Sequence, residues 1–265
     1  VAELVYAYDS ESYSARIGSS SLPMPTVKVT PVKTGVFKER ENLAAFVARY
    51  IPKLQNGSIL VVTSKIVALA EGSVVAATTP RAKDALIRAE SDWQLQAKGG
   101  KITLKDGLLM WNAGIDESNA KGNVILLPKD SFKAAARLRK ALMRQFHIRN
   151  CGVIISDSRV MLLRAGVVGI ALGYAGFKGV RDYRGQKDMF GRKLKFTQTD
   201  IADSLATAAA LVMGEGSEQQ PLCVIEDAPV EFVNRVNKKE LLIPMKDDMY
   251  APLFGRVVRS RRTKN

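Results

Sequence analysis

Three short runs rich in β-branched residues, far apart in the sequence, constrain the fold more than any other feature. They are Ser58–Thr63, Val153–Ser156 and Leu222–Ile225. Runs of this length and composition are typical of strands that are buried in a sheet. The segments between them carry helical patterns and further strands, but without a regular βαβ rhythm. We therefore expect an α+β fold with mixed sheets and flanking helices, rather than a doubly wound sheet.

The remaining elements follow from local patterns of apolar, capping and turn residues. Helices are predicted at Glu41–Ile51, from Ser64-Lys65 to Glu71-Gly72, at Lys83–Ala97, at Phe132–Phe146 with Ser131 as its cap, and from the cap Asp200 to Met213. Further strands are predicted at Leu4–Tyr8, Val27–Val32, Ile102–Leu104, Leu108–Trp111, Val124–Leu127 and Gly166–Tyr174.

The chain has 265 residues, enough for one large domain or two small ones with a sizeable core. Its Ser- and Pro-rich start predicts an N-terminal extension at residues 1–28. A main domain is expected at 29–245, with room for two subdomains, and a basic tail at 246–265. No secretory signal or bilayer-length apolar run is evident. Cys151 and Cys223 adjoin β-branched runs and are interpreted as buried, reduced thiols, which favours a cytoplasmic protein.

The formal net charge of +14 indicates an anionic partner, which is nucleic acid, a membrane surface or a small anion. Part of this charge is the basic tail, and part is one face of the predicted helix 132–146, formed by Lys133, Arg137, Lys140 and Arg144. A solvated face explains this stripe as well as a docking surface does. A nucleic-acid-binding protein is the rival hypothesis, but aromatic residues are only 7% of the chain and no binding motif is present.

Several familiar chemistries have little support in this sequence. His147 is the only histidine and reads as a helix-end residue, so Ser–His or Cys–His catalysis and a zinc site are disfavoured. Neither a P-loop nor a dinucleotide-binding glycine fingerprint is found. The glycines within 166–176 are spaced irregularly, and close packing is the favoured interpretation.

Carboxylate and amide chemistry remains. Asp116 lies in the segment Asn112–Asn119 after an apolar run, Asp157-Ser158 follows Val153–Ser156, and Glu215 stands between two glycines. Oxygen ligands at the ends of elements suit Mg²⁺ or Mn²⁺ ions that bridge nucleotide phosphates, and glycine-flanked N–H groups suit a phosphate cradle. Taken singly, each acid is better explained as a cap or a surface charge than as a metal ligand. The segment Arg181–Arg192 reads either as a solvated hairpin or as a loop that closes over an anionic substrate.

At this point the chain resembles a known family, the γ-glutamyl ligases that add glutamate to precursors of coenzyme F420. The matching segments occur in order over roughly residues 29 to 226. They are Leu60–Lys65 with Ala70–Gly72, Asn112–Asn119, Val153–Ser158, Gly166–Gly173, Asp182–Asp188 with Gly191-Arg192, and Ala202-Asp203 through Leu211–Gly216.

The resemblance implies a GTP-dependent (or ATP-dependent), divalent-metal-dependent ligase with an α+β fold that forms a homodimer. It implies that the substrate carboxylate is activated as an acyl phosphate, which the amine of L-glutamate attacks. The implied acceptor is coenzyme F420-0 or a folate- or pteroate-type compound, since some relatives are assigned to folate metabolism. A non-catalytic relative that only binds nucleotide is a further alternative.

The resemblance also implies roles for individual residues. Catalytic roles fall to Asp116 and Asp157. Metal ligands, for two Mg²⁺ or Mn²⁺ ions with K⁺ as a further candidate ion, are Asp116, Asp157, Ser158 and Glu215. Nucleotide contacts are Ser64, Lys65, Asn119, Met213, Gly214 and Gly216.

The chain departs from the family pattern in three places. Lys33-Thr-Gly35 replaces the usual Gly-Leu/Ile-Pro entry segment, Leu69 replaces a lysine, and Arg159–Leu163 stands where a Gly-Arg pair and an aromatic are common. The proposed metal ligands persist, whereas positions expected to contact the base or the acceptor have changed. The departures therefore bear on the acceptor more than on the reaction.

Overall fold

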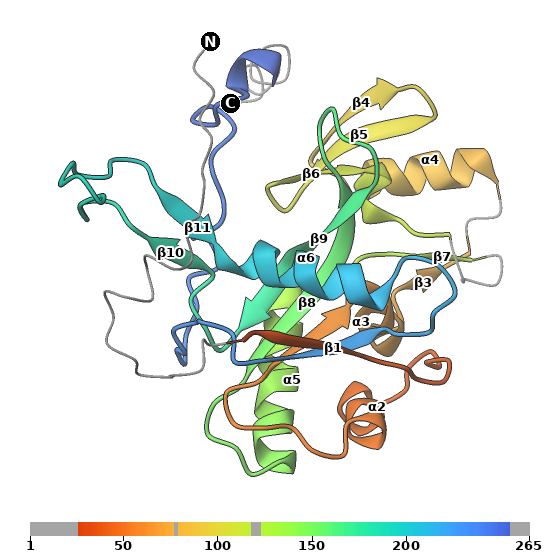
Figure 1. Cartoon of the computed structure of the whole chain (residues 1–265). Coiled ribbons are helices and arrows are strands. Elements are labelled where there is room, and N and C mark those ends of the chain that lie inside the picture. Colours follow the sequence, from red (N-terminus) through yellow and green to blue (C-terminus); the bar gives the residue numbers. More distant parts are fainter. Residues whose placement is uncertain (1–25, 77–78, 118–122, 255–265) are drawn as a thin grey trace.

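The three β-branched runs form adjacent strands at the centre of a five-stranded sheet in the computed structural model, which describes residues 26–76, 79–117 and 123–254 (Figure 1). The strand order is β1-β12-β2-β8-β9. Their bounds are β1 (Lys28–Val32), β12 (Leu222–Glu226), β2 (Ile59–Thr63), β8 (Gly152–Val160) and β9 (Val167–Ala175). Only β2 and β8 run parallel, and every other neighbouring pair is antiparallel. The predicted mixed sheet is confirmed.

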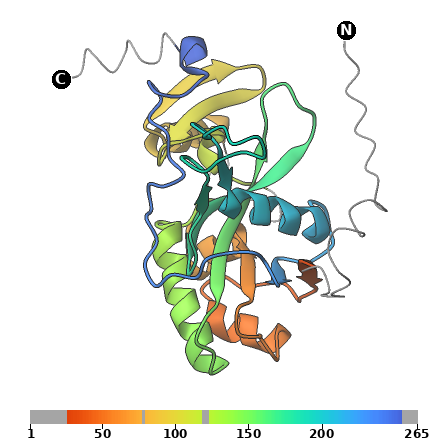
Figure 2. The same ribbon diagram turned by 60° about the vertical axis from the view of Figure 1, so that its left-hand side comes forward.

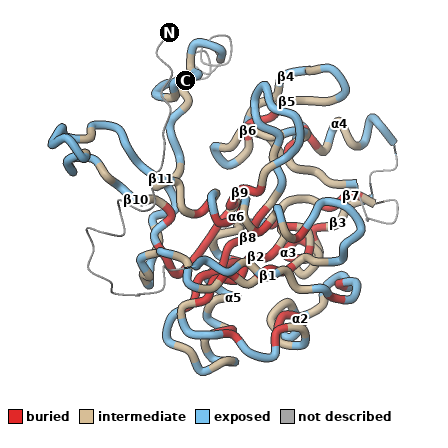
Figure 3. Tube along the Cα trace, in the orientation of Figure 1, coloured by how far each residue is buried: buried red, intermediate tan, exposed pale blue. Residues whose placement is uncertain are grey.

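Helices cover both faces of this sheet, so its strands are buried on both sides (Figures 1 and 3). One face packs against α2 (Leu43–Tyr50), α3 (Ser64–Glu71) and α5 (Ser131–Gln145), and the other against α6 (Ile201–Met213). Alternation along β2 divides its side chains between the two cores: Leu60 joins the first and Val61 the second. This two-sided burial explains why the strands read as continuous apolar runs.

The glycines of β9 allow helices to approach the sheet closely. A Cβ atom on Gly169 would lie 2.3 Å from the carbonyl oxygen of Ala206 in α6, and one on Gly173 would lie 2.5 Å from the backbone of α5. Both distances are impossible for a side chain. Gly166 differs, since it has open space around it and a φ of +89°, which suits a turn. Close packing therefore explains the two glycines inside the strand.

A small three-stranded sheet lies beyond the end of the central sheet from which the β8–β9 hairpin projects (Figure 2). It consists of β4 (Trp93–Ala97), β5 (Gly100–Lys105) and β6 (Leu108–Trp111), preceded by α4 (Pro80–Ala89). The β5–β6 hairpin was predicted. The helix predicted over Lys83–Ala97 is wrong in its second half, because the chain turns after α4 and β4 then pairs with β5.

The remaining elements are short. They are β3 (Val74–Val75) paired with β7 (Val124–Ile125), β10 (Val180–Asp182) paired with β11 (Gln198–Asp200), and two 3₁₀ turns at Asn112–Gly114 and Ala251–Phe254. The β10–β11 pair supports an exposed hairpin that contains the Arg181–Arg192 segment. No helix in the described ranges is long and apolar enough to cross a bilayer.

Details of the predicted boundaries need correction. The N-cap of α5 is Asp130 rather than Ser131, because the Asp130 carboxylate accepts the Lys133 N–H at 2.8 Å. The cap at Asp200 is confirmed by its 2.9 Å hydrogen bond from Asp203 N–H. Cys151 and Cys223 are buried free thiols, as predicted. The strand predicted at Leu4–Tyr8 lies outside the described residues.

Candidate active site

Asp157 lies where the central sheet narrows to two strands. The parallel pairing of β2 with β8 ends at Thr63 and Ser156, and a β-bulge lies between Ile155 and Ser156. Beyond that point β8 continues to Val160 as a ribbon with β9 alone. The sequence placed Asp157-Ser158 after the end of a strand, and this is wrong. The pair lies inside a longer strand, at the point where one neighbour is lost.

The parallel strands bring Ser64 to Asp157. Ser64 is the first residue of α3 and follows β2 directly, so it starts at the sheet edge where Asp157 emerges. Its hydroxyl donates a 2.9 Å hydrogen bond to Asp157 Oδ1. Ser64 is buried, and the carboxylate of Asp157 therefore has a fixed orientation.

Asp116 joins this site through the next residue of α3. Lys65 Nζ lies 2.7 Å from Asp116 Oδ2. The backbone of Asp116 is held by a pair of hydrogen bonds to Ile125 of β7, at 3.0 and 2.8 Å. Two adjacent residues of α3 thus contact two carboxylates that are 41 residues apart in the sequence.

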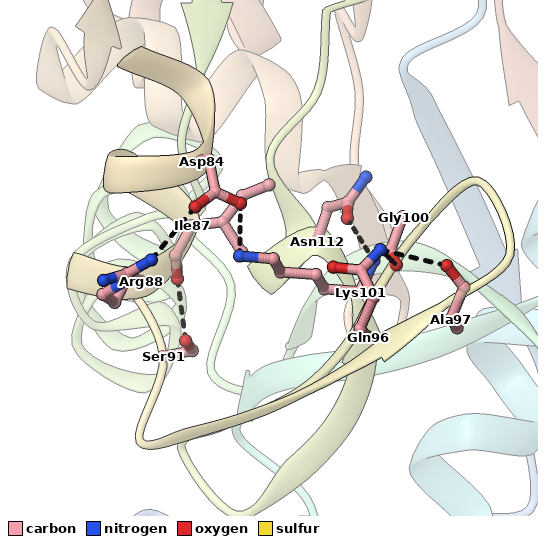
Figure 4. A network of polar contacts seen from close by, with 9 residues as sticks. All are labelled: Asp84, Ile87, Arg88, Ser91, Gln96, Ala97, Gly100, Lys101 and Asn112. Carbon is pink, nitrogen blue, oxygen red and sulfur yellow. Dashed lines mark hydrogen bonds and ion pairs between the residues drawn. The ribbon is translucent and has the colours of Figure 1, made fainter. Parts of the chain in front are cut away.

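The turn before Asp116 is anchored to the small sheet. Asn112 has a φ of +49°, and its side-chain oxygen accepts the Lys101 N–H at 2.8 Å (Figure 4). The Ala113 N–H donates to the hydroxyl of Thr103, also at 2.8 Å. Lys101 in turn forms an ion pair with Asp84 of α4 (Figure 4). Asn112 therefore has a structural role, and the small sheet sets the position from which Asp116 approaches.

The electrostatics of Asp157 are unusual for a carboxylate. Burial raises the pKa of Asp157 to about 6, and the negative charge of Asp116 adds to the increase. The hydrogen bond from Ser64 acts in the opposite direction. A proton or a cation near Asp157 would relieve this unfavourable charge, which is the condition expected of a cation-binding carboxylate.

Ser158 and Glu215 form a second pair beside the first. The Ser158 hydroxyl lies 2.7 and 2.9 Å from the two carboxylate oxygens of Glu215. Glu215 follows α6, which ends at Met213, and Gly214 continues the chain with a φ of +78°. The end of α6 therefore lies close to β8. This proximity is required if Asp157, Ser158 and Glu215 belong to one site.

The cradle predicted around Glu215 already holds an internal anion. The N–H of Gly216 donates to Glu218 Oε2 at 2.8 Å, and the Glu218 carboxylate lies against Gly214. These are the backbone positions that were predicted to receive phosphate oxygens. The geometry is consistent with anion binding at this loop, with Glu218 as the present occupant.

The predicted site residues thus fall into two pairs of contacts. Within the described ranges, no three His, Cys, Asp or Glu side chains come close enough together to hold a metal ion. Asp116 and Asp157 are coupled through space and through α3, whereas Glu215 connects to them only through Ser158 and the backbone of β8. Asn119 lies outside the described residues.

Arg159 was not predicted to have a role, yet it lies beside this site. It lines a cavity of about 390 Å³ and is within electrostatic reach of Asp157 and Asp203. Burial lowers its pKa, and the two acids oppose that change. The alternation of side chains along a strand could have identified Arg159. In a strand that is extended past Ser156, Arg159 falls on the same face as Asp157.

Comparisons with known proteins place the chain in a family. Residues 31–227 match the model of the family described as F420-0:gamma-glutamyl ligase. The chain is 33% identical over 250 residues to the coenzyme F420:L-glutamate ligase of Methanocaldococcus jannaschii, an alignment that covers 84% of this chain and 96% of that protein.

Two further relatives carry the same name. Identity to the ligase of Methanopyrus kandleri is 33% over 229 residues, covering 79% of this chain and 90% of the relative. Identity to that of Archaeoglobus fulgidus is 33% over 218 residues, covering 75% and 87%. The paired carboxylates lie within the matched region. The chain therefore belongs to the F420-0:gamma-glutamyl ligase family of glutamate-adding enzymes.

Proposed function

We propose that this enzyme is a GTP-dependent (or ATP-dependent), divalent-metal-dependent ligase that joins L-glutamate to a substrate carboxylate through an acyl phosphate. The observation that carries the proposal is the Asp116–Asp157 pair, held by consecutive residues of α3 and electrostatically coupled. Phosphoryl transfer depends on positioned charges more than on a histidine base. This chain offers that arrangement and has one histidine, the exposed His147.

The donor set suits Mg²⁺ or Mn²⁺. Asp116 and Asp157 supply carboxylate oxygens, and Ser158 and Glu215 supply a hydroxyl and a third carboxylate. Such oxygen ligands are those that these hard cations prefer. When bound, the cations would neutralise charge on the transferred phosphoryl group. Two ions are proposed, one for each pair, with K⁺ as a further candidate.

The chain's own residues would position the reactants. In the first step, a substrate carboxylate oxygen bonds to the terminal phosphorus of GTP as the bond to GDP breaks. In the second step, the glutamate amine bonds to the acyl carbon, phosphate leaves, and the nitrogen loses a proton. We propose that nucleotide phosphates are contacted by Lys65, which is held at the Asp116 carboxylate, and by the N–H groups of the Met213–Gly216 loop. Ser64 and Asn119 are proposed as further nucleotide contacts.

Two acceptors are proposed, coenzyme F420-0 and a folate- or pteroate-type acid. The names of the relatives favour the first. The departures at Lys33–Gly35, Leu69 and Arg159–Leu163 keep the second in consideration. Each proposed acceptor is a carboxylic acid, so the same activation chemistry applies to either.

The test is phosphate release by the purified chain with GTP, Mn²⁺, L-glutamate and each acceptor in turn, repeated with ATP. Product mass should increase by one glutamyl unit for each amide bond formed. Asp157→Asn should abolish release, whereas Asp247→Asn, a change of the same kind at an exposed position, should leave it intact. The proposal fails if neither acceptor and neither nucleotide supports turnover. Nucleotide binding without phosphate release would identify a non-catalytic relative.

The nucleic-acid hypothesis receives little support from the basic face of α5. Arg137 forms an ion pair with Glu71 at 3.0 Å, and Lys133 lies 3.4 Å from Asp130. Half of the predicted stripe is thus partly neutralised by neighbouring acids. Binding of RNA or DNA that is salt-dependent and occurs without ligase activity would restore this hypothesis.

A homodimer and a cytoplasmic location are also proposed. Exposed apolar side chains favour self-association: Met189, Phe190 and Phe196 on the β10–β11 hairpin are each nearly nine-tenths exposed. Light scattering during size-exclusion chromatography tests the assembly state, and a monomer at micromolar concentration would contradict it.

A further inference from the structure

A cavity of about 390 Å³ adjoins the candidate active site and has no assigned occupant. It lies between the β5–β6 turn, the N-terminal ends of α5 and α6, and β9. Leu127, Phe132, Leu172 and Leu242 contribute apolar walls. A volume of this size fits a drug-sized aromatic molecule better than a single amino acid.

Charged side chains line the rest of this cavity, namely the acids Asp106, Asp130, Asp200 and Asp203 and the bases Lys129, Lys238, Lys239 and Arg159. The base next to the candidate active site is Arg159. Its guanidinium takes part in no hydrogen bond or ion pair with any described residue. Guanidinium groups carry five donors, and a partly buried one normally pairs with an acceptor. Asp157 and Asp203 influence it only through space. A guanidinium without a hydrogen-bonded partner at the wall of a cavity is suited to a ligand that supplies a carboxylate.

One wall of the cavity comes from outside the matched family region, which ends at residue 227. Lys238, Lys239, Leu241 and Leu242 line it. Their segment is fastened by Glu240, whose carboxylate accepts hydrogen bonds from the Tyr174 hydroxyl and, at 2.7 Å, from the Gly179 N–H. The cavity is therefore lined both by the region that matches the family model and by a segment that follows it. Such a combination is expected of a chamber that determines substrate specificity.

We infer that this cavity is the acceptor chamber: it takes a flat, apolar acid whose carboxylate binds Arg159 beside Asp157. This inference rests on the proposed function, since it supplies the substrate that the carboxylate pair would activate. Arg159 orients the acceptor carboxylate toward the reacting end, and the leucine and phenylalanine walls enclose the body. Lys239 at the wall suits further negative charge on the same molecule, whereas Lys238 lies 3.4 Å from the Asp130 carboxylate.

The first experiment needs no turnover. Anilinonaphthalene sulfonate, a flat apolar anion, is titrated into the full chain and its fluorescence is followed. Arg159→Gln should weaken its binding about tenfold, the scale of one charge-assisted hydrogen bond. Arg149→Gln, the same change at an exposed position before β8, should leave it unchanged. Equal affinity for Arg159→Gln and the unmodified chain, or no binding by the unmodified chain, would overturn the inference.

Leu172→Trp provides a second variant, in case loss of Arg159 impairs folding. It fills the chamber and should abolish probe binding while circular dichroism stays unchanged. Retained probe binding in a folded Leu172→Trp protein would contradict the assignment.

The second experiment is kinetic and separates this inference from the proposed function. With an accepted acceptor, Arg159→Gln should raise the acceptor KM about tenfold, and Arg159→Lys should recover part of that loss. The KM values for GTP and glutamate should stay within about twofold. A selective effect on the GTP or glutamate KM would overturn the chamber while the ligase proposal stands. Absence of all turnover, together with Arg159-dependent probe binding, would leave an anion site at Arg159 and would defeat both the ligase proposal and the assignment of the cavity to its acceptor.

Discussion

The central sheet and the small β4–β6 sheet are held in place by different forces. Strands β2 and β8 bury apolar side chains on both faces, against helices on each side. In the small sheet, Leu95 and Trp111 are 51% and 45% exposed. Ion pairs of Lys101 with Asp84 and of Lys105 with Glu90 join that sheet to α4. One sheet is therefore fixed by packing, and the other is attached largely by charge.

The difference matters because each sheet positions one carboxylate of the candidate site. Asp157 belongs to β8 of the central sheet, whereas Asp116 follows the turn anchored on β5 of the small sheet. Salt screening weakens ion pairs, and it weakens part-buried pairs such as these less than exposed ones. We therefore expect the small sheet and Asp116 to move relative to Asp157 at lower cost than any strand of the central sheet.

The largest expected effect is on catalysis. Asp157→Asn should lower kcat roughly a hundred- to thousandfold, the scale of losing one preorganised electrostatic group, because a charge held by the central sheet is removed. Thermal unfolding should change little, since asparagine keeps an acceptor for Ser64. Steady-state phosphate release and calorimetry measure the two effects. Comparable losses of activity and stability would mean that Asp157 is structural.

Packing in the two sheets can be compared directly by truncating one leucine in each. Leu142→Ala in α5 removes a fully buried side chain from the central core and should cost about 3 kcal/mol. Leu95→Ala in the small sheet should cost about 0.5 kcal/mol, as expected for an exposed site. Urea unfolding measures both. Equal losses would show that the small sheet is packed as firmly as the central one.

A pH effect should appear at the N-terminus of α6. Burial, with a contribution from the charge of Asp203, raises the pKa of Asp200 from 3.8 to about 6. The folded state thus disfavours the charged form of Asp200. The contribution of Asp200 to the free energy of unfolding therefore becomes progressively less favourable as pH rises from about 4 through 6. Asp200→Asn keeps the cap and removes that dependence.

The stability gain of Asp200→Asn over the unmodified chain should grow from near zero at about pH 4 to about 1–2 kcal/mol at about pH 8, after allowance for partial exposure. Chemical unfolding across that range tests it. A gain that is constant with pH, or a loss, would contradict the assignment of the shift to Asp200.

The smallest effect concerns an ion pair of the small sheet. Glu90→Gln removes the partner of Lys105, at 2.6 Å, and should cost about 0.5 kcal/mol. Hydrogen exchange should become faster in α4 and β5 and stay unchanged in β2. The difference in stability between Glu90→Gln and the unmodified chain should diminish in high salt, because salt screens the Lys105–Glu90 pair of the unmodified chain. A salt-independent difference would point to packing instead.

The sequence predicted the central elements well because their signals are local and redundant. The run Ile59–Val62 is apolar and buried, and Gly72 ends α3 in the left-handed conformation with a φ of +67°. The helix predicted through Trp93 failed because a three-strand pairing outweighed helical propensity. The end of β8 was missed because Asp157, Ser158 and Arg159 are polar, and ribbon strands outside a core carry no apolar signal.

The candidate site was predictable in part. Family resemblance identified Asp116, Asp157 and Glu215, and the structure supplies their partners: Lys65, Ser64 and Ser158. The Ser64–Asp157 contact depends on the parallel pairing of β2 with β8, which no local pattern encodes. The cavity at Arg159 was beyond prediction, because six separate segments converge there.

The hydrogen bonds of Glu240 have an evolutionary consequence. They fasten the C-terminal wall to the core through one carboxylate, which contacts Tyr174 and Gly179. A lineage that preserves this fastening is free to alter the neighbouring residues of the wall without disturbing β8 or α3. Acceptor preference can then diverge among descendants while the phosphoryl-transfer machinery is inherited unchanged.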